Sequence, residues 1–226
     1  MDGPSAADAR GVAIVLGAGG PVDSRVAPLL PPADLVVAAD SGLAQAAPLG
    51  LHVDAVVGDL DSVDPAMLAA ARATGTAVER HPVAKNEIDL ELAIQTASAR
   101  GATRVVVVTG AGGRMDMLLA NALVLAHEQY AHLRVEAWTD RAWSAIARGR
   151  GRVELDGRPG ELVSLLALGG TAHGVCTEGL QYPLHHEDLH PGSGRGVSNA
   201  LLDVHAAVDL DAGVLLVIRP HALEEP

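Results

Sequence analysis

Hydrophobic positions in the first 140 residues come in short continuous runs, each followed by small or acidic residues. Such runs are typical of strands covered on both faces, because alternation disappears when neither face meets water. We expect strands at residues 12–16, 35–39, 54–57, 78–82, 103–109 and 134–138. Helical spacing between them predicts helices at 43–49, 65–74, 85–99 and 117–131. Strand, turn and helix in alternation predict an α/β fold with a doubly wound, mostly parallel sheet.

The pattern changes near residue 140, where helical spacing ends and short apolar or alternating runs begin. The runs lie at 144–147, 152–155, 161–166, 172–176, 198–208 and 214–218. Turn signals separate them, which is typical of a small antiparallel sandwich or barrel. We therefore expect an α/β domain over residues 1–140 and an antiparallel β-sandwich over residues 141–226.

Composition narrows the function classes. The formal charge is −12, and an acidic chain without a Lys/Arg cluster is a poor binder of nucleic acid. No apolar run approaches the ~18 residues of a membrane span. Cys176 is the only cysteine, which excludes an intramolecular disulfide, and residues 1–10 lack a signal-peptide core. These features predict a cytoplasmic protein.

Two carboxylates, Asp59 and Asp61, follow the third predicted strand, with Gly58 before them and Ser62 after them. If strand geometry persists to Asp61, both point to the same side, about 7 Å apart along the chain. Paired carboxylates repel each other unless a cation lies between them, and Mg²⁺ prefers such oxygen ligands. The alternative is an acidic turn in which Asp61 or Ser62 caps the next helix.

Other strand ends carry candidate ligand-binding residues. Asp40 follows the second strand, where open α/β sheets place their ligands, although it also suits a helix cap. Lys85 precedes a helix start that Asn86 is expected to cap, and its ammonium could meet phosphate. The glycine loop at 110–113 leads into Arg114 and Asp116, a combination suited to polyphosphate, or to a capped helix with a solvated arginine.

Two further patterns have ordinary explanations. The glycine-rich turn at 17–21 is either a tight turn or a nucleotide contact, and it matches neither a complete dinucleotide fingerprint nor a Walker A loop. His186 to His190 spells H-E-x-x-H, which needs a helix to bring both imidazoles to one zinc ion. Prolines lie close on either side of it, so we expect a solvated loop.

Six short stretches in order along the chain resemble the thiamine pyrophosphokinase family. They are 39–42 (ADSG), 58–62 (GDLDS), 85–89 (KNEID), 112–116 (GGRMD), 178–184 (EGLQYPL) and 196–199 (GVSN). The first four fall on predicted strand-to-helix turns, and the resemblance covers residues 12–218. It implies an enzyme that moves the terminal pyrophosphate of ATP onto the hydroxyl of thiamine and releases AMP. It also implies a homodimer with its active site between the subunits.

The resemblance also implies roles for individual residues. Asp59, Asp61 and Asp89 would hold Mg²⁺ and, with Asp116, form the catalytic set. The residues that would contact ATP are Asp40, Ser62, Lys85, Asn86, Gly112, Gly113 and Arg114. Thiamine would meet Tyr182, Ser198 and Asn199.

Three residues depart from the family pattern, which usually reads K-D-x-T-D and G-G-R-x-D-H. Asn86 and Ile88 replace the Asp and the Thr of the first motif, and Met117 replaces the His of the second. Asn86 keeps an oxygen but loses a charge, and Met117 removes a donor. The alternative function is therefore a weak or inactive nucleotide- or thiamine-binding regulatory protein, and a diphosphotransferase for another small alcohol is a third possibility.

Overall fold

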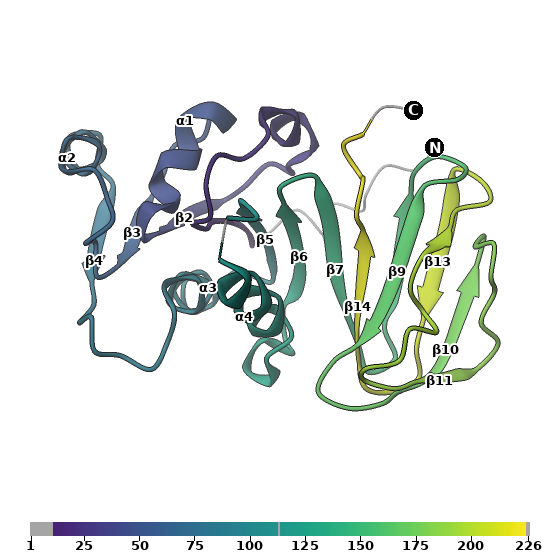
Figure 1. The fold of residues 1–226 in the computed structure, drawn as a ribbon. Helices are drawn as coiled ribbons and strands as arrows, with labels where there is room; N and C mark the ends of the chain where they lie inside the picture. Colours follow the sequence, from purple (N-terminus) through teal and green to yellow (C-terminus); the bar gives the residue numbers. More distant parts are fainter. Residues whose placement is uncertain (1–10, 113, 225–226) are drawn as a thin grey trace. The chain divides into compact units, whose positions relative to one another are not determined.

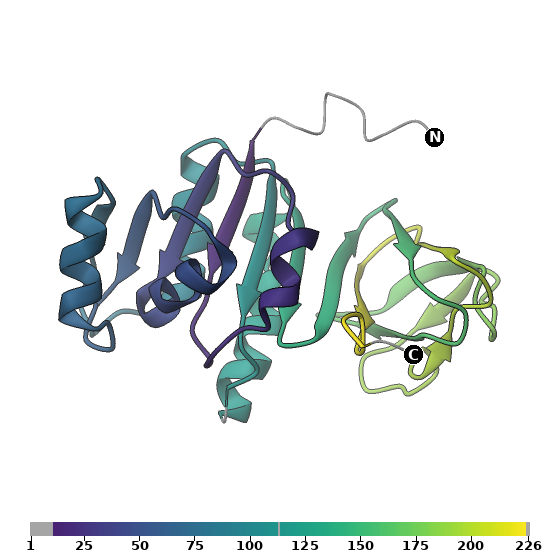
Figure 2. The same ribbon diagram turned by 90° about the horizontal axis from the view of Figure 1, so that it is seen from above.

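The chain folds into two compact units, seen in a computed structural model that describes residues 11–112 and 114–224. Gly113, an expected ATP contact, lies outside the described residues. One unit takes in the chain up to Val124 together with His132–Asp140. The other takes in Leu125–Ala131 and the chain from Arg141 onward. Figures 1 and 2 show both units along the colour ramp of the sequence.

A parallel sheet forms the centre of the first unit. Its strands are β1 (Val12–Leu16), β2 (Leu35–Ala39), β3 (Ala55–Gly58), β4 (Ala77–Arg80), β5 (Arg104–Thr109) and β6 (Arg134–Thr139). They lie in the order β6-β5-β1-β2-β3-β4, and each neighbouring pair is parallel. Strand β1 is buried at all five positions, as its continuous apolar run predicts. The doubly wound parallel sheet is confirmed.

The first unit has four α-helices near the four predicted ones, with different ends, and two 3₁₀ helices in addition. They are η1 (Ser24–Leu29), η2 (Asp40–Gln45), α1 (Ala46–Leu49), α2 (Pro65–Ala73), α3 (Asp89–Ala99) and α4 (Met115–Leu125). Asp64 caps α2 and Pro65 is its first residue. The expectation for α3 is wrong at its start: it begins at Asp89 and its N-cap is Ile88, not Asn86. Helix α4 ends at Leu125, and a 3₁₀ turn η3 (Glu128–Tyr130) follows.

Strand order places a topological switch point between β1 and β5. The chain winds from β1 outward to β4, then returns through α3 to β5 on the other side of β1. Helix α3 packs across β1, β2 and β3, on the face of the sheet opposite α1 (Figure 1). In open parallel sheets, ligands bind at the carboxyl ends of strands around such a point. The turns after β1, β2, β3 and β5 all lie at this edge.

Two antiparallel sheets make up the second unit. Its strands are β7 (Ala142–Arg148), β8 (Arg152–Asp156), β9 (Leu162–Ala167), β10 (Ala172–Glu178), β11 (Glu187–Leu189), β12 (Asn199–Ala200), β13 (His205–Asp209) and β14 (Val214–Arg219). One sheet runs β12-β9-β14-β7 and the other β11-β10-β13-β8. Leu155, Val163, Leu165 and Leu215 belong to its buried core, whose members come from both sheets. The antiparallel β domain is confirmed.

Three details of the second unit differ from expectation. The run at 198–208 divides into β12 and β13. The H-E-x-x-H stretch, expected to be a loop, contains strand β11, so the helix needed for a zinc site does not form. Residues 125–131 join this unit, where the Arg148 guanidinium donates to the carbonyls of Leu125 and His127. Among the described residues, no helix is long and apolar enough to cross a membrane.

Candidate active site

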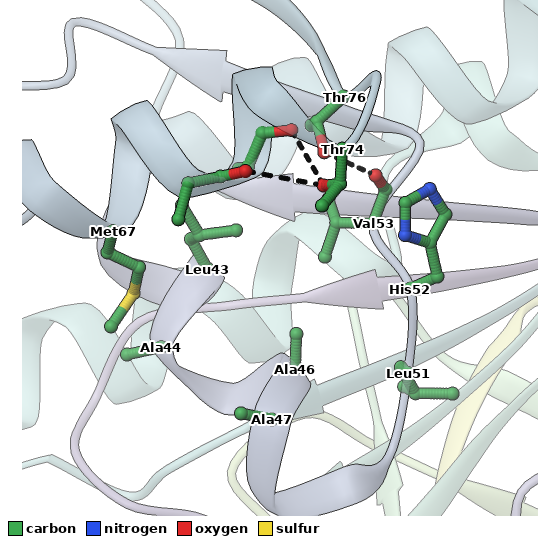
Figure 3. Close-up of a pocket in the computed structure, with 12 residues that line it drawn as sticks. Leu43, Ala44, Ala46, Ala47, Leu51, His52, Val53, Met67, Thr74 and Thr76 are labelled. Carbon is green, nitrogen blue, oxygen red and sulfur yellow. Dashed lines mark hydrogen bonds between the residues drawn. The ribbon is translucent and has the colours of Figure 1, made fainter.

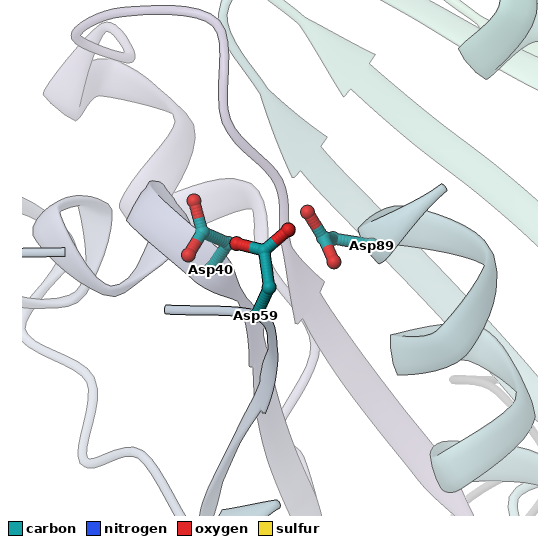
Figure 4. A group of neighbouring side chains, drawn as sticks. All are labelled: Asp40, Asp59 and Asp89. Carbon is teal, nitrogen blue, oxygen red and sulfur yellow. The ribbon is translucent and has the colours of Figure 1, made fainter. Parts of the chain in front are cut away.

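Three aspartates converge at the carboxyl edge of the parallel sheet (Figure 4). Asp40 follows β2, Asp59 follows β3, and Asp89 is the first residue of α3. One carboxylate oxygen from each lies within 4.8 Å of the other two. Three carboxylates at this spacing repel one another, so the cluster favours a cation among them.

Gly58, the last residue of β3, lets the three aspartates approach. A Cβ at this position would lie 3.0 Å from Asp89 Oδ1 and 3.1 Å from the Cβ of Asp40. Its φ of 146° lies in a region that L side chains rarely adopt. A side chain here would push Asp40 and Asp89 apart, so the carboxylate cluster depends on this glycine.

Asp40 is the most buried of the three clustered aspartates. It is only 6% exposed, and its Oδ1 has no hydrogen-bond partner within the described chain. Burial, with the charges of Asp89, Asp59 and Asp61 adding to it, raises the pKa of Asp40 above its ordinary value. Its φ of 46° is unusual for a residue other than glycine, and Asp and Asn tolerate that region best.

Asp59 is held in its charged form. Its Oδ1 accepts a hydrogen bond of 3.2 Å from the backbone N–H of Asp61. That hydrogen bond, with the charge of Lys85, holds the pKa of Asp59 below its ordinary value. Lys85 Nζ lies 3.4 Å from Asp59 Oδ2 and 2.8 Å from Asp89 Oδ1. Two carboxylates of one cluster are thus shifted in opposite directions by their surroundings.

The donor set of this cluster fits a magnesium ion. All three side chains offer hard carboxylate oxygens, which are the ligands that Mg²⁺ prefers. Asp40 also has a buried oxygen without a hydrogen-bond partner in the described chain, and a cation held by its carboxylate would offset the cost of that burial. The sequence analysis gave Asp40 as an ATP contact and not as a metal ligand, because the proximity of Asp40 to Asp59 depends on β2 lying next to β3.

Asp61 lies beyond the end of β3, so the strand alternation expected to place it on the same side as Asp59 does not extend to it. Strand β3 stops at Gly58, and Leu60 adopts a left-handed φ of 64°. Asp61 is exposed, and its Oδ1 accepts a 2.9 Å hydrogen bond from Ser62 Oγ. It remains near enough for its charge to raise the pKa of Asp40. Asn86, the other expected oxygen donor, is exposed at the surface.

Glycine loops after β1 and β5 pack directly against each other at the switch point. A Cβ on Gly19 would collide with the backbone of Gly110, and one on Gly112 would lie 2.9 Å from the Cα of Gly19. Gln45, which is buried, holds the first loop by accepting from Val22 N–H at 3.1 Å and donating to Gly20. These contacts give the glycines a packing role, and they leave backbone N–H groups at the edge where a phosphate would bind.

Arg114 and Asp116 form an exposed ion pair at the start of α4. Arg114 Nε lies 3.2 Å from Asp116 Oδ1, and the second nitrogen lies 2.5 Å from Oδ2. The hydrogen bond from Arg114 lowers the pKa of Asp116. Both side chains are more than half exposed, so the pair is available to a charged ligand.

In the second unit, the three expected thiamine contacts are brought together, with unequal exposure. Tyr182 is 55% exposed and Asn199 only 4%. The Asn199 amide accepts from Tyr182 N–H at 2.9 Å and donates to the Tyr182 carbonyl at 2.7 Å. Asn199 therefore positions Tyr182 with its side chain. Ser198, between them, has a left-handed φ of 59° and is exposed.

A separate apolar pocket lies between α1 and α2 (Figure 3). Its volume is about 250 Å³, and Leu43, Leu51, Val53, Met67 and several alanines line it. Its threonine hydroxyls are used internally: Thr76 donates to the Val53 carbonyl and Thr74 to that of Ala71. The pocket has no carboxylate, so the acidic cluster is the better candidate for chemistry.

Two family models match the sequence. The model described as thiamin pyrophosphokinase, catalytic domain, matches residues 26–137. The model described as thiamin pyrophosphokinase, vitamin B1 binding domain, matches residues 152–215. A search of curated protein sequences found no match.

Solved structures with a similar fold include thiamine pyrophosphokinase from Bacillus subtilis, with a TM-score of 0.78 and 21% identity over 92% of this chain and 98% of that one. A thiamin pyrophosphokinase family protein from Enterococcus faecalis has a TM-score of 0.75 and 22% identity, over 95% of this chain and 99% of that one. Thiamin pyrophosphokinase from Candida albicans has a TM-score of 0.73 and 14% identity, over 92% of this chain and 88% of that one.

Proposed function

Because the chain belongs to the thiamin pyrophosphokinase family, we propose that it transfers the terminal pyrophosphate of ATP to the hydroxyl of thiamine. The products are thiamine diphosphate and AMP. By family the chain is a transferase and a thiamine diphosphokinase, with a catalytic and a vitamin B1 binding domain. We assign nucleotide and metal binding to residues 1–140 and thiamine binding to residues 141–226.

The single observation that carries the proposal is the convergence of Asp40, Asp59 and Asp89, in which Asp40 is buried and has an unpartnered oxygen. These residues would hold Mg²⁺, and Asp61 would add a ligand from the adjoining loop. When bound, the ion neutralises negative charge on the phosphate oxygens. Pyrophosphoryl transfer needs mainly this neutralisation and an in-line arrangement of the reacting atoms.

The remaining residues would bind and orient the nucleotide. Lys85 and Arg114 supply donors for phosphate oxygens, and Asp116 orients Arg114 through the ion pair described above. We also assign nucleotide contacts to Gly112, Gly113, Ser62 and Asn86, as the family resemblance implies. A carboxylate of the cluster would accept the proton that leaves the thiamine hydroxyl.

Thiamine binding is assigned to the β domain. Tyr182 offers an exposed aromatic face, which suits a cationic thiazolium ring. Ser198 offers a hydroxyl, and Asn199 holds the Tyr182 backbone. We further propose a homodimer in which the active site is completed between subunits, as the family resemblance implies.

The test is an assay of AMP release from ATP with thiamine and Mg²⁺. We expect turnover that EDTA abolishes. Asp59→Asn should lower kcat by at least about a hundredfold, because it removes a charged oxygen that acts on the transferred group. Asp156→Asn is the matched control, since Asp156 is an exposed carboxylate in the β domain that pairs with His205. Wild-type turnover in Asp59→Asn would refute the metal assignment.

A regulatory protein without turnover is not favoured. The departures at Asn86 and Ile88 leave Asp89 in the cluster, and Met117 lies on α4 just after the Arg114–Asp116 pair. The carboxylates that catalysis requires are therefore present. Thiamine binding at high enzyme concentration with no AMP release would reverse this preference.

A further inference from the structure

Lys85 is the only lysine in the chain, and the other 15 of its 16 Lys and Arg residues are arginines. Its ammonium contacts two of the three clustered carboxylates, at 2.8 Å from Asp89 Oδ1 and 3.4 Å from Asp59 Oδ2. The side chain is 12% exposed. The one lysine ammonium, which is compact and can rotate, thus lies at the candidate metal site, whereas the other permanently positive side chains are arginines.

The carboxylates that Lys85 contacts are two of those that a divalent cation would need. A cation held by Asp59 and Asp89 would lie close to the ammonium, and the two like charges would repel each other. Contact of both with the same two carboxylates is therefore less favourable than contact of either alone. Cation binding and the present position of Lys85 therefore oppose each other.

The chemistry of lysine suits an exchange of partners. Its charge sits on a flexible four-carbon stem, whereas an arginine fork would bind a carboxylate through two parallel hydrogen bonds and hold it more firmly. Lys85 lies in the connection between β4 and α3, outside any helix or strand. Its charge can therefore move from one anionic group to another without disturbing a regular element.

We propose that Lys85 is the counter-ion of Asp59 and Asp89 while no metal is bound, and that a divalent cation displaces it. The Lys85 ammonium then forms an ion pair with a phosphate group of the nucleotide. This inference rests on the proposed function. It makes metal binding the step that releases the lysine for the nucleotide. If Lys85 were only a structural ion pair, its removal would leave cation affinity unchanged or weaker; as a competitor, its removal strengthens it.

The first test uses the wild-type protein and an amine-acylating reagent. Because there is one lysine, mass spectrometry of its peptide reports Lys85 alone, with the chain's α-amino group as the internal reference. We expect acylation several times faster with Mg²⁺ than with EDTA, and slow again when an unreactive ATP analogue is added with Mg²⁺. An unchanged rate at Mg²⁺ concentrations where calorimetry shows binding overturns the proposal, as does the absence of any Mg²⁺ binding.

The second test compares Mn²⁺ affinity by calorimetry and electron paramagnetic resonance. Lys85→Met keeps the stem and removes the charge, and we expect it to bind Mn²⁺ about tenfold more tightly. The control is Arg100→Met, which removes one positive charge and the ion pair with Glu79 at the opposite end of α3. It should bind Mn²⁺ as the wild type does. Unchanged or weaker binding in Lys85→Met overturns the proposal.

Turnover separates this inference from the proposed function. If Lys85→Met does not fold, the acylation of the wild-type protein decides alone. AMP release by the wild-type protein, together with acylation that Mg²⁺ does not change, refutes the counter-ion role and leaves the enzyme assignment standing. No AMP release, with acylation that does respond to Mg²⁺, refutes the enzyme assignment and supports the counter-ion role.

Discussion

Asp40 combines three unfavourable features at one residue. It is buried, one of its oxygens lacks a hydrogen-bond partner in the described part of the chain, and its backbone has a left-handed φ of 46°. Strained and poorly solvated residues of this kind persist where surrounding structure imposes them, and they cluster at functional sites. We infer that Asp40 keeps these three features because its carboxylate belongs to the cluster with Asp59 and Asp89.

Asp40→Asn should therefore stabilise the protein in EDTA while abolishing Mg²⁺-dependent turnover. A raised pKa means that the folded protein holds the Asp40 proton more tightly than the unfolded chain. The stability from the neutral carboxyl is complete below the ordinary pKa of about 3.9 and is lost as pH rises through the raised pKa. Asparagine stays neutral and tolerates the same φ. We expect a higher Tm at pH 7, by about 2–4 °C for each kcal/mol relieved, and no gain near pH 3.

Calorimetric scans between pH 3 and pH 8 would check this, with Asp156→Asn as the exposed control. A gain that is equal at both ends of the range would mean that charge on Asp40 is not the cause. A lower Tm at pH 7 would mean that the Asp40 carboxylate has a stabilising partner in solution.

At the residue scale, the sequence predicted a metal site from Asp59, Asp61 and Asp89, whereas the cluster in the structure consists of Asp40, Asp59 and Asp89. Asp59 was paired with Asp61 because a strand places i and i+2 on one side, but β3 ends at Gly58 and Leu60 turns left-handed. Residues 40, 59 and 89 are far apart in sequence, and their meeting depends on the order of strands in the sheet. Likewise, the hydrogen bonds of the Asn199 amide with the Tyr182 backbone depend on a contact between β12 and a segment 17 residues earlier in the chain.

At the scale of elements, α3 begins without a side-chain cap. Its N-cap is Ile88, and an isoleucine cannot accept a hydrogen bond from the exposed N–H groups of the first turn. Asn86, expected as the cap, lies two residues too early. The family pattern usually has threonine at the position of Ile88, which is a good N-cap residue.

Ile88→Thr should increase the free energy of unfolding. The new sequence T-D-L-E would form a capping box over residues 88–91, with Glu91 three positions after the cap. The matched control is Ile88→Val, which has the shape of threonine without the hydroxyl. We expect the threonine variant to be about 1 kcal/mol more stable than the valine variant in urea denaturation.

The outcome also bears on the site, because Asp89 is the first residue of the capped turn. Equal stability of the two variants would mean that the first turn of α3 already has partners for its N–H groups.

Elements were predictable to different degrees for physical reasons. The strands of the parallel sheet are buried on both faces, so their apolar runs mark them clearly; β1 and β2 match to the residue. The predicted helix at 43–49 is divided in the structure between the 3₁₀ helix η2 and the short α1. Strand β11 was missed because its three residues include Glu187 and Asp188, which form no apolar alternation.

At the scale of the whole molecule, the order of the sheet brings candidate site residues to one edge. β1 and β5 flank the switch point, β2 and β3 follow on one side, and the turns after all four carry glycines or acids. The sequence predicted these turns individually. It could not predict which turns lie next to each other, because that depends on the order of the strands in the sheet. In that order β5 lies beside β1, although three strands separate them along the chain.

Helix α4 is apolar on both sides, which a helix at a protein surface normally is not. Met117, Ala120 and Val124 lie on its partly buried side. The opposite side carries Met115, Leu118, Leu119 and Leu123, which are 74%, 39%, 52% and 59% exposed. These four residues recur at helical spacing and form one stripe. A surface stripe of large apolar side chains next to the Arg114–Asp116 pair is suited to a second copy of the chain, consistent with the proposed homodimer.

Leu119→Glu combined with Leu123→Glu should therefore separate the proposed homodimer into monomers. Each buried leucine contributes about 1.5–3 kcal/mol, so the loss from both copies should raise the dimer dissociation constant by at least about a hundredfold. Size-exclusion chromatography with light scattering would measure the mass against 23.1 kDa for one chain. Leu202→Glu is the control, since Leu202 is 61% exposed on the β domain. A monomeric wild type whose Tm falls with the double substitution would show that the stripe packs against its own chain.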